Sequence, residues 1–320
     1  MVISKCLGFA HCRYDGGIVE DKFIDKLKSL LHLLPVCPEM ELGLGVPREP
    51  LRVAGDNRKL SLIQPATKID LTEQMHSFCS SYLASLPEPD GFILKSKSPS
   101  CGIRDVKQYA GADSTCFQGR GSGLFAAEVL ARFPHLAVED EARLADVKIR
   151  RHFLTKLFTL ARYREVKRSG TLEALRAFHS RNELLLSAYH RTLFNRLGRI
   201  MDNCEKKPPS ELFADYWKML LRVLARAPRR ASFSRTLRYC LSLLSEKLSG
   251  KEKALIEGEI GKYDSGLIPL FIPLAILKSF TTRYEEGFLM KQSFFTPYPE
   301  ELNPEELTEL VFTEFYNKKP

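Results

Sequence analysis

The chain has 320 residues, 44% of them hydrophobic and 27% charged, a composition that excludes both a disordered chain and a single small domain. The longest apolar run, residues 267–277, contains Pro269 and Pro273 and is shorter than the roughly 20 residues that a membrane-spanning helix needs. We therefore expect two globular domains and no membrane anchor.

The net charge of +9 belongs to the second half of the chain. Residues 1–140 contain 16 Lys and Arg against 17 Asp and Glu, a net charge of −1, so residues 141–320 carry +10. A basic domain can attract RNA, but the sequence shows no RNA-binding signature and no aromatic platform. A solvated helical surface is the favoured interpretation, and RNA stays open as a partner of this half.

The eight cysteines are irregularly spaced and do not form the dense disulfide framework of a small secreted domain. The N-terminus lacks the basic region, apolar core and cleavage site of a secretion signal. We expect a cytoplasmic protein with reduced thiols, which raises the question of metal or cluster ligation.

The first 140 residues alternate short β-rich runs with amphipathic helical runs. Strands are expected at residues 2–7, from residue 35 and at 92–94, and helices at 21–34, at 71–86 and from about Leu124. This alternation predicts an α/β domain with a largely parallel sheet flanked by helices.

Cys6, Cys37 and Cys101 each lie at or just beyond the carboxyl end of a predicted strand. Open α/β sheets place their ligands at this edge, so the three thiols are expected in one crevice. The glycine-rich segment 119–123 precedes a helix whose N–H groups could receive an anion, although a tight loop without a ligand is at least as well supported.

The second half shows long amphipathic helices and no convincing strands. The helices are expected at residues 145–168, 171–201, 210–227, 233–248 and 251–261. The predicted organisation is an α/β domain over residues 1–144 followed by an all-α domain over 145–320.

Three thiolates meeting in one crevice suit an iron–sulfur cluster or zinc, because both favour soft ligands. The ligands lie 31 and 64 residues apart and include no close pair such as C-x-x-C. From the spacing alone, each cysteine is as well explained as a buried, inert thiol.

The residues around these cysteines resemble the signature blocks of the thiouracil desulfidase (TudS) family. The matching blocks are Ser4-Lys5-Cys6-Leu7, Arg13-Tyr14-Asp15-Gly16, Cys37-Pro38-Glu39, Pro47-Arg48-Glu49-Pro50, Lys95-Ser96-Lys97-Ser98-Pro99-Ser100-Cys101-Gly102, Gly123-Leu124-Phe125-Ala126 and Pro134-His135-Leu136-Ala137-Val138-Glu139-Asp140. They occur in the family's order over residues 1–145.

The resemblance implies a [4Fe-4S] cluster held by Cys6, Cys37 and Cys101, with a fourth iron that has no protein ligand. It implies an enzyme, a non-redox desulfidase that hydrolytically removes sulfur from a thiolated pyrimidine, nucleoside or similar small thiocarbonyl substrate. The substrate sulfur would bind the open iron, which acts as a Lewis acid. Cys12 stands where the family usually has an aliphatic residue. As a fourth ligand it would close the open iron, and a thiol that takes no part is the favoured interpretation.

Five further residues match positions that the resemblance assigns to the site. Glu39 is expected to accept a proton and Ser98 to donate a hydrogen bond or relay a proton, whereas Ser100, Lys97 and Arg48 are expected to bind substrate. Each has a structural alternative: a loop hydrogen bond for Glu39, loop capping for the serines, and a solvated charge for Lys97 and Arg48. The remaining cysteines, Cys79, Cys116, Cys204 and Cys240, are expected to be structural.

The second half resembles the YbgA-like domain. Its matching segments are Arg151–Phe158, Gly170-Thr171-Leu172, Phe178–Asn182 and Phe288–Leu302, and the match over residues 145–305 supplies an architecture without an activity. Two alternatives to the desulfidase remain: a cluster-bearing RNA-binding or regulatory module using the basic residues near 150–168, and a zinc site on the same three cysteines.

Overall fold

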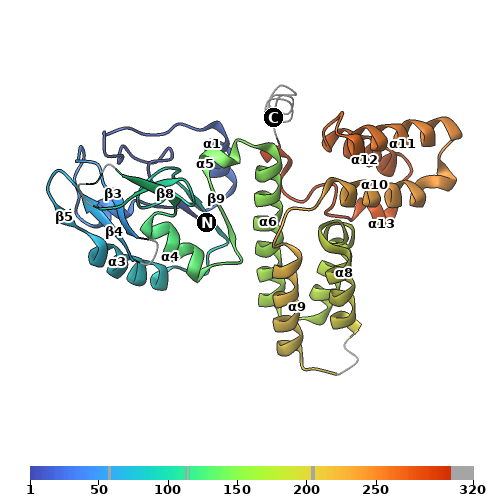
Figure 1. The fold of residues 1–320 in the computed structure, drawn as a ribbon. Helices are drawn as coiled ribbons and strands as arrows, with labels where there is room; N and C mark the ends of the chain where they lie inside the picture. The colour runs from blue at the N-terminus through green and yellow to red at the C-terminus, as the bar shows by residue number, and fades with distance from the viewer. Residues whose placement is uncertain (57–58, 112–113, 115, 203–205, 304–320) are drawn as a thin grey trace. The chain divides into compact units, whose positions relative to one another are not determined.

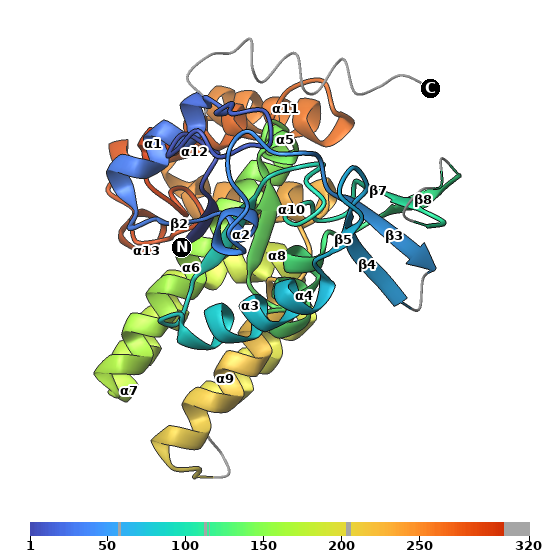
Figure 2. The same ribbon diagram turned by 90° about the vertical axis from the view of Figure 1, so that its left-hand side faces the viewer.

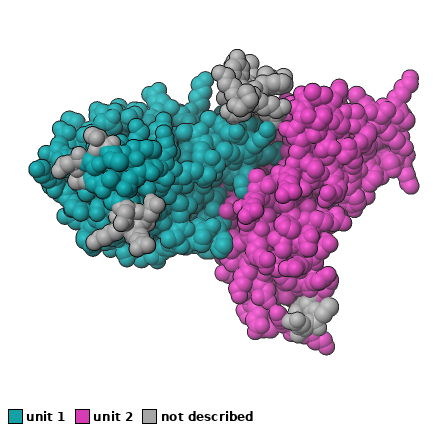
Figure 3. Space-filling view, in the orientation of Figure 1, with its two compact units in different colours: residues 1–153 teal, residues 154–320 magenta. Residues whose placement is uncertain are grey.

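The computed structural model describes residues 1–56, 59–111, 114, 116–202 and 206–303 (Figure 1). The chain divides into two compact units, residues 1–153 and 154–320, coloured separately in Figure 3. The division falls within helix α6 (Val147–Ser169). The boundary expected from the sequence, after residue 144, lies slightly before it.

Unit 1 contains a four-stranded parallel sheet with the strand order β2-β1-β6-β9. Its strands are β1 (Val2–Ser4), β2 (Leu34–Val36), β6 (Gly91–Leu94) and β9 (Ala137–Asp140). In register, Val2 pairs with both Leu34 and Phe92. All residues of β1 and β6 are buried, as expected for short apolar runs covered on both faces. The predicted parallel sheet is confirmed.

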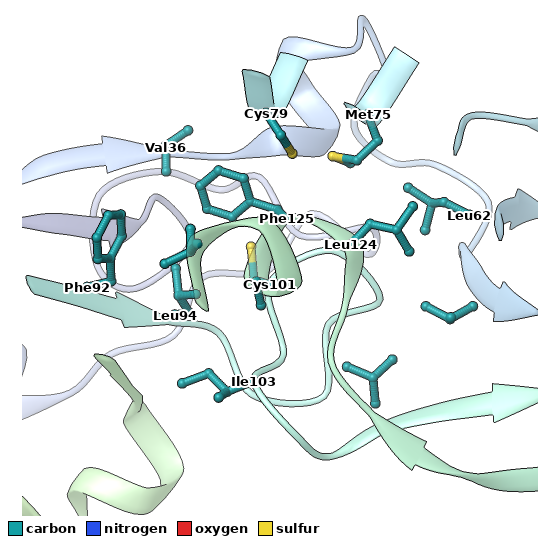
Figure 4. Packing of buried hydrophobic residues seen from close by; sticks show 14 of the residues in the cluster. Val36, Leu62, Met75, Cys79, Phe92, Leu94, Cys101, Ile103, Leu124 and Phe125 are labelled. Atoms are coloured by element: carbon teal, nitrogen blue, oxygen red, sulfur yellow. The ribbon is translucent and has the colours of Figure 1, made fainter. Parts of the chain in front are cut away.

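Helices of unit 1 supply apolar side chains to the core. Asp21 caps α1 (Lys22–Leu30), which buries Phe23, Ile24 and Leu27. A core cluster joins sheet residues to α3 (Thr72–Ser85) and α4 (Leu124–Arg132). Figure 4 shows Met75 and Cys79 of α3 and Phe125 of α4 facing this core. Two short helices, α2 (Pro38–Glu41) and α5 (Glu141–Leu144), follow strands of the parallel sheet.

A second sheet, which the sequence analysis did not predict, has the strand order β5-β4-β3-β7-β8 (Figure 2). Its strands are β3 (Arg52–Asp56), β4 (Lys59–Gln64), β5 (Ile69–Asp70), β7 (Val106–Tyr109) and β8 (Phe117–Gly121). All neighbours are antiparallel except β3 and β7. Pairing with neighbours stabilises these short strands, since β5 is fully exposed and β8 carries Gly119 and Gly121.

Unit 2 is helical, which confirms the prediction for the second half. It contains α7 (Leu172–Arg181), α8 (Glu183–Asp202), α9 (Pro209–Val223), α10 (Arg230–Leu244), α11 (Gly250–Ser265), α12 (Phe271–Arg283), α13 (Gly287–Met290) and the 3-10 turns Ser245–Lys247 and Glu300–Leu302, with most of α6. α12 begins within the apolar run, with Pro273 in its first turn, where a missing N–H is tolerated. None of the described helices is long and apolar enough to cross a membrane.

The single helix expected at residues 171–201 is two helices divided at Asn182. The buried Asn182 side chain donates to the Phe178 carbonyl (2.7 Å) and accepts from the Ser293 hydroxyl (2.6 Å). Gln292 bridges the same helices, donating to the Ser180 carbonyl and accepting from the Leu184 N–H. The closing segment of the YbgA-like match, Phe288–Leu302, therefore stabilises the junction between α7 and α8 through these hydrogen bonds.

An aromatic stack forms the centre of the α6–α9 packing. The Tyr163 ring stacks on Tyr216 and on Trp217, with centroid distances of 5.5 and 5.3 Å, and its hydroxyl donates to the Phe213 carbonyl. His179 lies within hydrogen-bond distance of the Tyr216 hydroxyl, at 3.0 Å, and stacks on another ring. This packing stabilises the helical unit and leaves these polar groups partnered.

Candidate functional site

The candidate site lies at the carboxyl ends of β1, β2 and β6. Strand order reverses at β1, because the chain passes from β1 to β2 on one side and later returns to β6 and β9 on the other. Such a switch point is where open α/β sheets bind ligands. Cys6 follows β1, Cys37 directly follows β2, and Cys101 lies in the loop after β6.

Four buried thiols lie at this edge. Cys6, Cys12 and Cys37 pack together in one apolar cluster with 8%, 4% and 9% exposure. The Cys37 thiol also lies 3.8 Å from the Cys12 carbonyl oxygen. Cys101 packs in the adjoining core, separate from this cluster. The structure thus groups two of the predicted ligands, Cys6 and Cys37, with Cys12 and places Cys101 in the neighbouring core.

Burial and mutual contact raise the pKa values of these thiols. At Cys12 the hydrogen bond with Cys37 lowers the pKa, but the hydrogen bond with Cys6 and burial outweigh it and raise the pKa to about 11. The hydrogen bond with Cys12, followed by burial, raises the pKa of Cys37, and burial is the largest cause of the raised pKa of Cys101. A bound metal centre would displace the thiol protons, because metal ligation requires the thiolate.

Glu39 links the loops that follow β2 and β6. Its Oε1 accepts from the Ser100 hydroxyl at 3.0 Å and from the Ser98 hydroxyl at 3.5 Å. Its Oε2 accepts from Nε and Nη2 of Arg48 at 2.9 and 2.6 Å. The side chains of Glu39 and Arg48 are only 10% and 6% exposed, so this is a buried ion pair.

Arg48 is also held by carbonyl groups. Nη2 donates to the Cys12 carbonyl at 3.0 Å and Nη1 to the Gly45 carbonyl at 3.2 Å, while the Arg48 N–H donates to the Tyr14 carbonyl. The guanidinium group thus positions Glu39 and the segment bearing Cys12. Its predicted role in binding substrate stays a prediction.

Ser98 organises the Cys101 loop. Its hydroxyl oxygen accepts from the N–H groups of Ser100 and Cys101, at 3.2 and 3.1 Å, and the α4 N-terminus covers the same loop. The N–H groups of Leu124 and Ala126 donate to the carbonyls of Pro99 and Ser100. Loop carbonyls therefore occupy the N–H groups of Leu124 and Ala126, which supports the tight-loop alternative for the glycine-rich segment.

Lys97 differs from the other predicted site residues because its side chain is exposed. Its φ of +60° places it in the left-handed region, and its N–H donates to Asp105 Oδ1 at 2.9 Å. The backbone is fixed while the ammonium group faces solvent. Its contact with a substrate stays a prediction.

Sequence reasoning missed a second group of polar side chains behind the Cys101 loop. Glu141 accepts from Lys95 Nζ (2.5 Å), from the Ser96 hydroxyl (2.6 Å) and from the Ser96 N–H (2.8 Å). The Lys95 N–H donates to Ser4 Oγ at 2.9 Å. Lys95 and Ser96 stand in a matched block, but nothing in the sequence pairs them with Glu141, which lies 45 residues beyond Ser96.

The other cysteines and the basic cluster give no second site. Cys79 and Cys240 are buried, Cys116 is exposed, and Cys204 lies outside the described residues. Arg162 donates to the Pro297 carbonyl, and Arg150 donates to the Leu144 carbonyl. No observation supports an RNA surface here, so RNA binding stays a prediction.

Within the described part of the chain, no three His, Cys, Asp or Glu side chains are grouped so that they could hold one metal ion. The ligands of a single zinc ion converge closely, since each Zn–S bond is about 2.3 Å long. The zinc alternative stays a prediction.

Comparisons with known proteins match two parts of the chain to two different families. The family described as 2-thiouracil desulfurase matches residues 1–141, and a family described as a protein of unknown function, DUF1722, matches residues 183–299. YbbK of Bacillus subtilis (strain 168) is 34% identical over 137 residues, which are 40% of this chain and 87% of that protein. YbgA of Escherichia coli (strain K12) is 22% identical over 152 residues, 47% of this chain and 90% of that protein.

A solved structure described as the [4Fe-4S]-dependent thiouracil desulfidase TudS is also similar. It is 25% identical, with a TM-score of 0.34, and the alignment covers 45% of this chain and 91% of that one. The family match over residues 1–141 contains Cys6, Cys12, Cys37 and Cys101 and the Glu39 network. Through this N-terminal region, the chain belongs to the 2-thiouracil desulfurase family.

Proposed function

We propose that unit 1 is a [4Fe-4S]-dependent desulfidase whose cluster is held by Cys6, Cys37 and Cys101. The donor set fits such a group, because buried thiols are the soft ligands that iron–sulfur clusters take. A four-iron cluster is wider than a single ion, so its thiolates need not converge on one point. The three loops that carry these cysteines all leave the same edge of the sheet.

The proposed reaction replaces the sulfur of a thiolated pyrimidine, nucleoside or similar thiocarbonyl compound by oxygen from water and releases hydrogen sulfide. Carbon keeps its oxidation state, so the reaction needs no electron donor. When bound, a cluster whose fourth iron has no thiolate from the three cysteines supplies a soft Lewis acid for the thiocarbonyl sulfur. The reducing cytoplasm remains the expected location.

Glu39 is the proposed proton acceptor. Because Arg48 occupies Oε2, the atom left to take a proton from the attacking water is Oε1. The hydroxyl groups of Ser98 and Ser100 meet this same atom and orient its lone pairs. In the proposed site Ser98 relays the proton, and Ser100, with Lys97 at the exposed rim, contacts the substrate.

The observation that carries the proposal is the bond between Glu39 Oε1 and the Cys101 loop. It places a buried carboxylate from the segment that starts at Cys37 against the two serines that precede Cys101. A carboxylate with purely structural work would not need to lie between two thiol-bearing segments.

The cofactor is tested by measuring iron and acid-labile sulfide per chain after anaerobic reconstitution. Wild type should hold about four of each, and Cys6→Ala, Cys37→Ala and Cys101→Ala should each lose the cluster. Cys240→Ala, which removes a buried thiol in unit 2, is the matched control and should retain it. Little iron in wild type would refute the proposal.

The chemistry is tested by following sulfide release from 2-thiouracil and from thiolated nucleosides. Glu39→Gln should keep the cluster but lower the rate by about 10²- to 10⁴-fold, the usual contribution of a positioned acid–base group. Glu41→Gln changes an exposed carboxylate of the same short helix and should leave the rate unchanged. Equal rates in the two variants would exclude Glu39 as the proton acceptor.

A further inference from the structure

We propose that Cys12 is a fourth thiolate ligand of the cluster in the substrate-free protein. This inference rests on the proposed function, because it concerns the iron that the other three cysteines leave without a thiolate. Its basis is the position of the Cys12 side chain, which packs in one buried cluster with Cys6 and Cys37. At 4% exposure, Cys12 is also more deeply buried than either of them.

The loop that carries Cys12 is folded back onto the strand that leads to Cys6. Lys5 uses its carbonyl oxygen to accept from the N–H groups of Phe9 and Ala10, and Cys12 then donates its own N–H to the Ala10 carbonyl. The far end of the loop is fixed by a bond from the Val19 N–H to the Cys6 carbonyl. These bonds return Cys12 to Cys6 and keep it there.

Arg48 fixes the same segment from the other side. Its Nη2 donates both to the Cys12 carbonyl at 3.0 Å and to Glu39 Oε2 at 2.6 Å. Arg48 therefore links the backbone of Cys12 to the carboxylate that is proposed to accept the proton. Arg48 thus fixes the backbone of Cys12, while the Cys12 side chain packs against Cys6 and Cys37.

The consequence for the enzyme is competition between Cys12 and the substrate sulfur. Both are soft sulfur donors, and the substrate must take the coordination position that Cys12 holds. The apparent affinity for a thiocarbonyl ligand is then the intrinsic affinity multiplied by the fraction of molecules in which Cys12 is not bound to the iron. Removing the Cys12 thiol should tighten binding of 2-thiouracil by about tenfold if Cys12 is bound in most molecules.

The test is oxidative loss of iron from the reconstituted protein, which is read by EPR and iron analysis and needs no turnover. An iron without a protein thiolate is released most easily on oxidation and leaves a paramagnetic three-iron cluster. Wild type and Cys79→Ala, the loss of another buried thiol of unit 1, should keep four irons under mild ferricyanide treatment. Cys12→Ala should lose one iron per chain and develop the three-iron EPR signal.

Cys12→Ser nearly preserves the side-chain volume and serves as a second variant in case the alanine variant has a folding defect. It should also lose iron more easily than wild type. A three-iron signal that is equally strong in wild type and in both Cys12 variants would overturn the inference and leave the proposed function standing. If wild type bound no cluster, both would fall. Tenfold tighter 2-thiouracil binding by Cys12→Ala, measured from the change in cluster absorbance, would support the inference.

Discussion

Replacing Arg48 by methionine tests whether the ion pair with Glu39 holds the site together. Methionine preserves most of the aliphatic stem but removes every guanidinium bond. The lost bonds include two to Glu39 Oε2, at 2.9 and 2.6 Å, and one each to the carbonyls of Cys12 and Gly45, at 3.0 and 3.2 Å. The variant leaves the Glu39 carboxylate buried with only two serine hydroxyls as partners.

The expected cost follows from the burial of both partners. Removing one member of a buried ion pair costs about 3–5 kcal/mol, because the other charge loses its compensation. Side-chain exposures of 6% and 10% place this pair in that class and not among exposed pairs. For a unit of this size, about 4 kcal/mol corresponds to a decrease in Tm of about 10 °C.

The assay is urea unfolding of the reduced, cluster-free protein, followed by far-UV circular dichroism. Arg104→Met is the matched control, because Arg104 is 55% exposed and lies 3.9 Å from Glu139, and it should cost less than about 1 kcal/mol. The single tryptophan, Trp217, lies in unit 2, so its fluorescence separates the unfolding of that unit.

The double variant Glu39→Gln, Arg48→Met completes a mutant cycle. Once Arg48 is gone, removing the charge of Glu39 should restore part of the stability, giving a coupling energy of about 2–3 kcal/mol. If the two single effects added to within about 0.5 kcal/mol, or if Arg48→Met unfolded like wild type, the buried pair would not hold this site.

Three further changes probe other parts of the molecule. In Gly123→Ala the added Cβ would lie 2.5 Å from the Pro99 carbonyl oxygen, so α4 must shift, and the free energy of unfolding of unit 1 in urea should fall by about 1–3 kcal/mol. Gly121→Ala is the control, because there the close atom is Nε2 of the flexible Gln108 side chain. An equally large decrease in Gly121→Ala would refute the steric reasoning. Glu141→Gln removes the charge that pairs with Lys95 behind the Cys101 loop. The reconstituted variant should lose iron to a chelator faster than wild type. An unchanged rate of iron loss would show that this pair does not support the loop. Burial lowers the pKa of His179, and the charge of Asp202 opposes this with a smaller effect. As pH falls through about 6.5, the unfolded state therefore takes up a proton at this histidine before the folded state does. The stability of unit 2, followed by Trp217 fluorescence in urea, should therefore decrease as pH falls from about 7 to about 5, and His179→Gln should flatten this dependence; parallel curves would exclude His179 as its source.

Two of the strands that position the site, β1 and β6, could be predicted because they are short and mainly apolar. β1 and β6 are buried over their whole length, so their sequences carry the signal without help from neighbours. The second sheet carries no such signal. Its strand β5 has two exposed residues, and its pairing with β4 depends on a neighbour in space that periodicity does not reveal.

The candidate site shows the same division between local and long-range information. That Glu39 follows Cys37 and that Ser98 and Ser100 precede Cys101 can be read from the sequence. The bond between Glu39 and Ser100 joins residues 61 positions apart, and the position of Cys12 depends on a loop fold that hydrophobic periodicity does not encode.

The three thiol-bearing loops are tied to one another by side chains of different kinds. Arg48 joins the segment after β1 to the segment after β2, through the Cys12 carbonyl and Glu39. Glu39 joins the β2 segment to the β6 loop through Ser100, and Ser4 joins β1 to the residue that follows β6. Loops on separate strands would otherwise move independently, and a catalytic arrangement needs its parts fixed to within about half an ångström. These bonds connect the three segments to one another in a closed cycle. Loss of activity in a variant of Arg48 or Ser4 must therefore be separated from displacement of the cysteines, by comparing cluster content with turnover, before either residue is given a role in the chemistry.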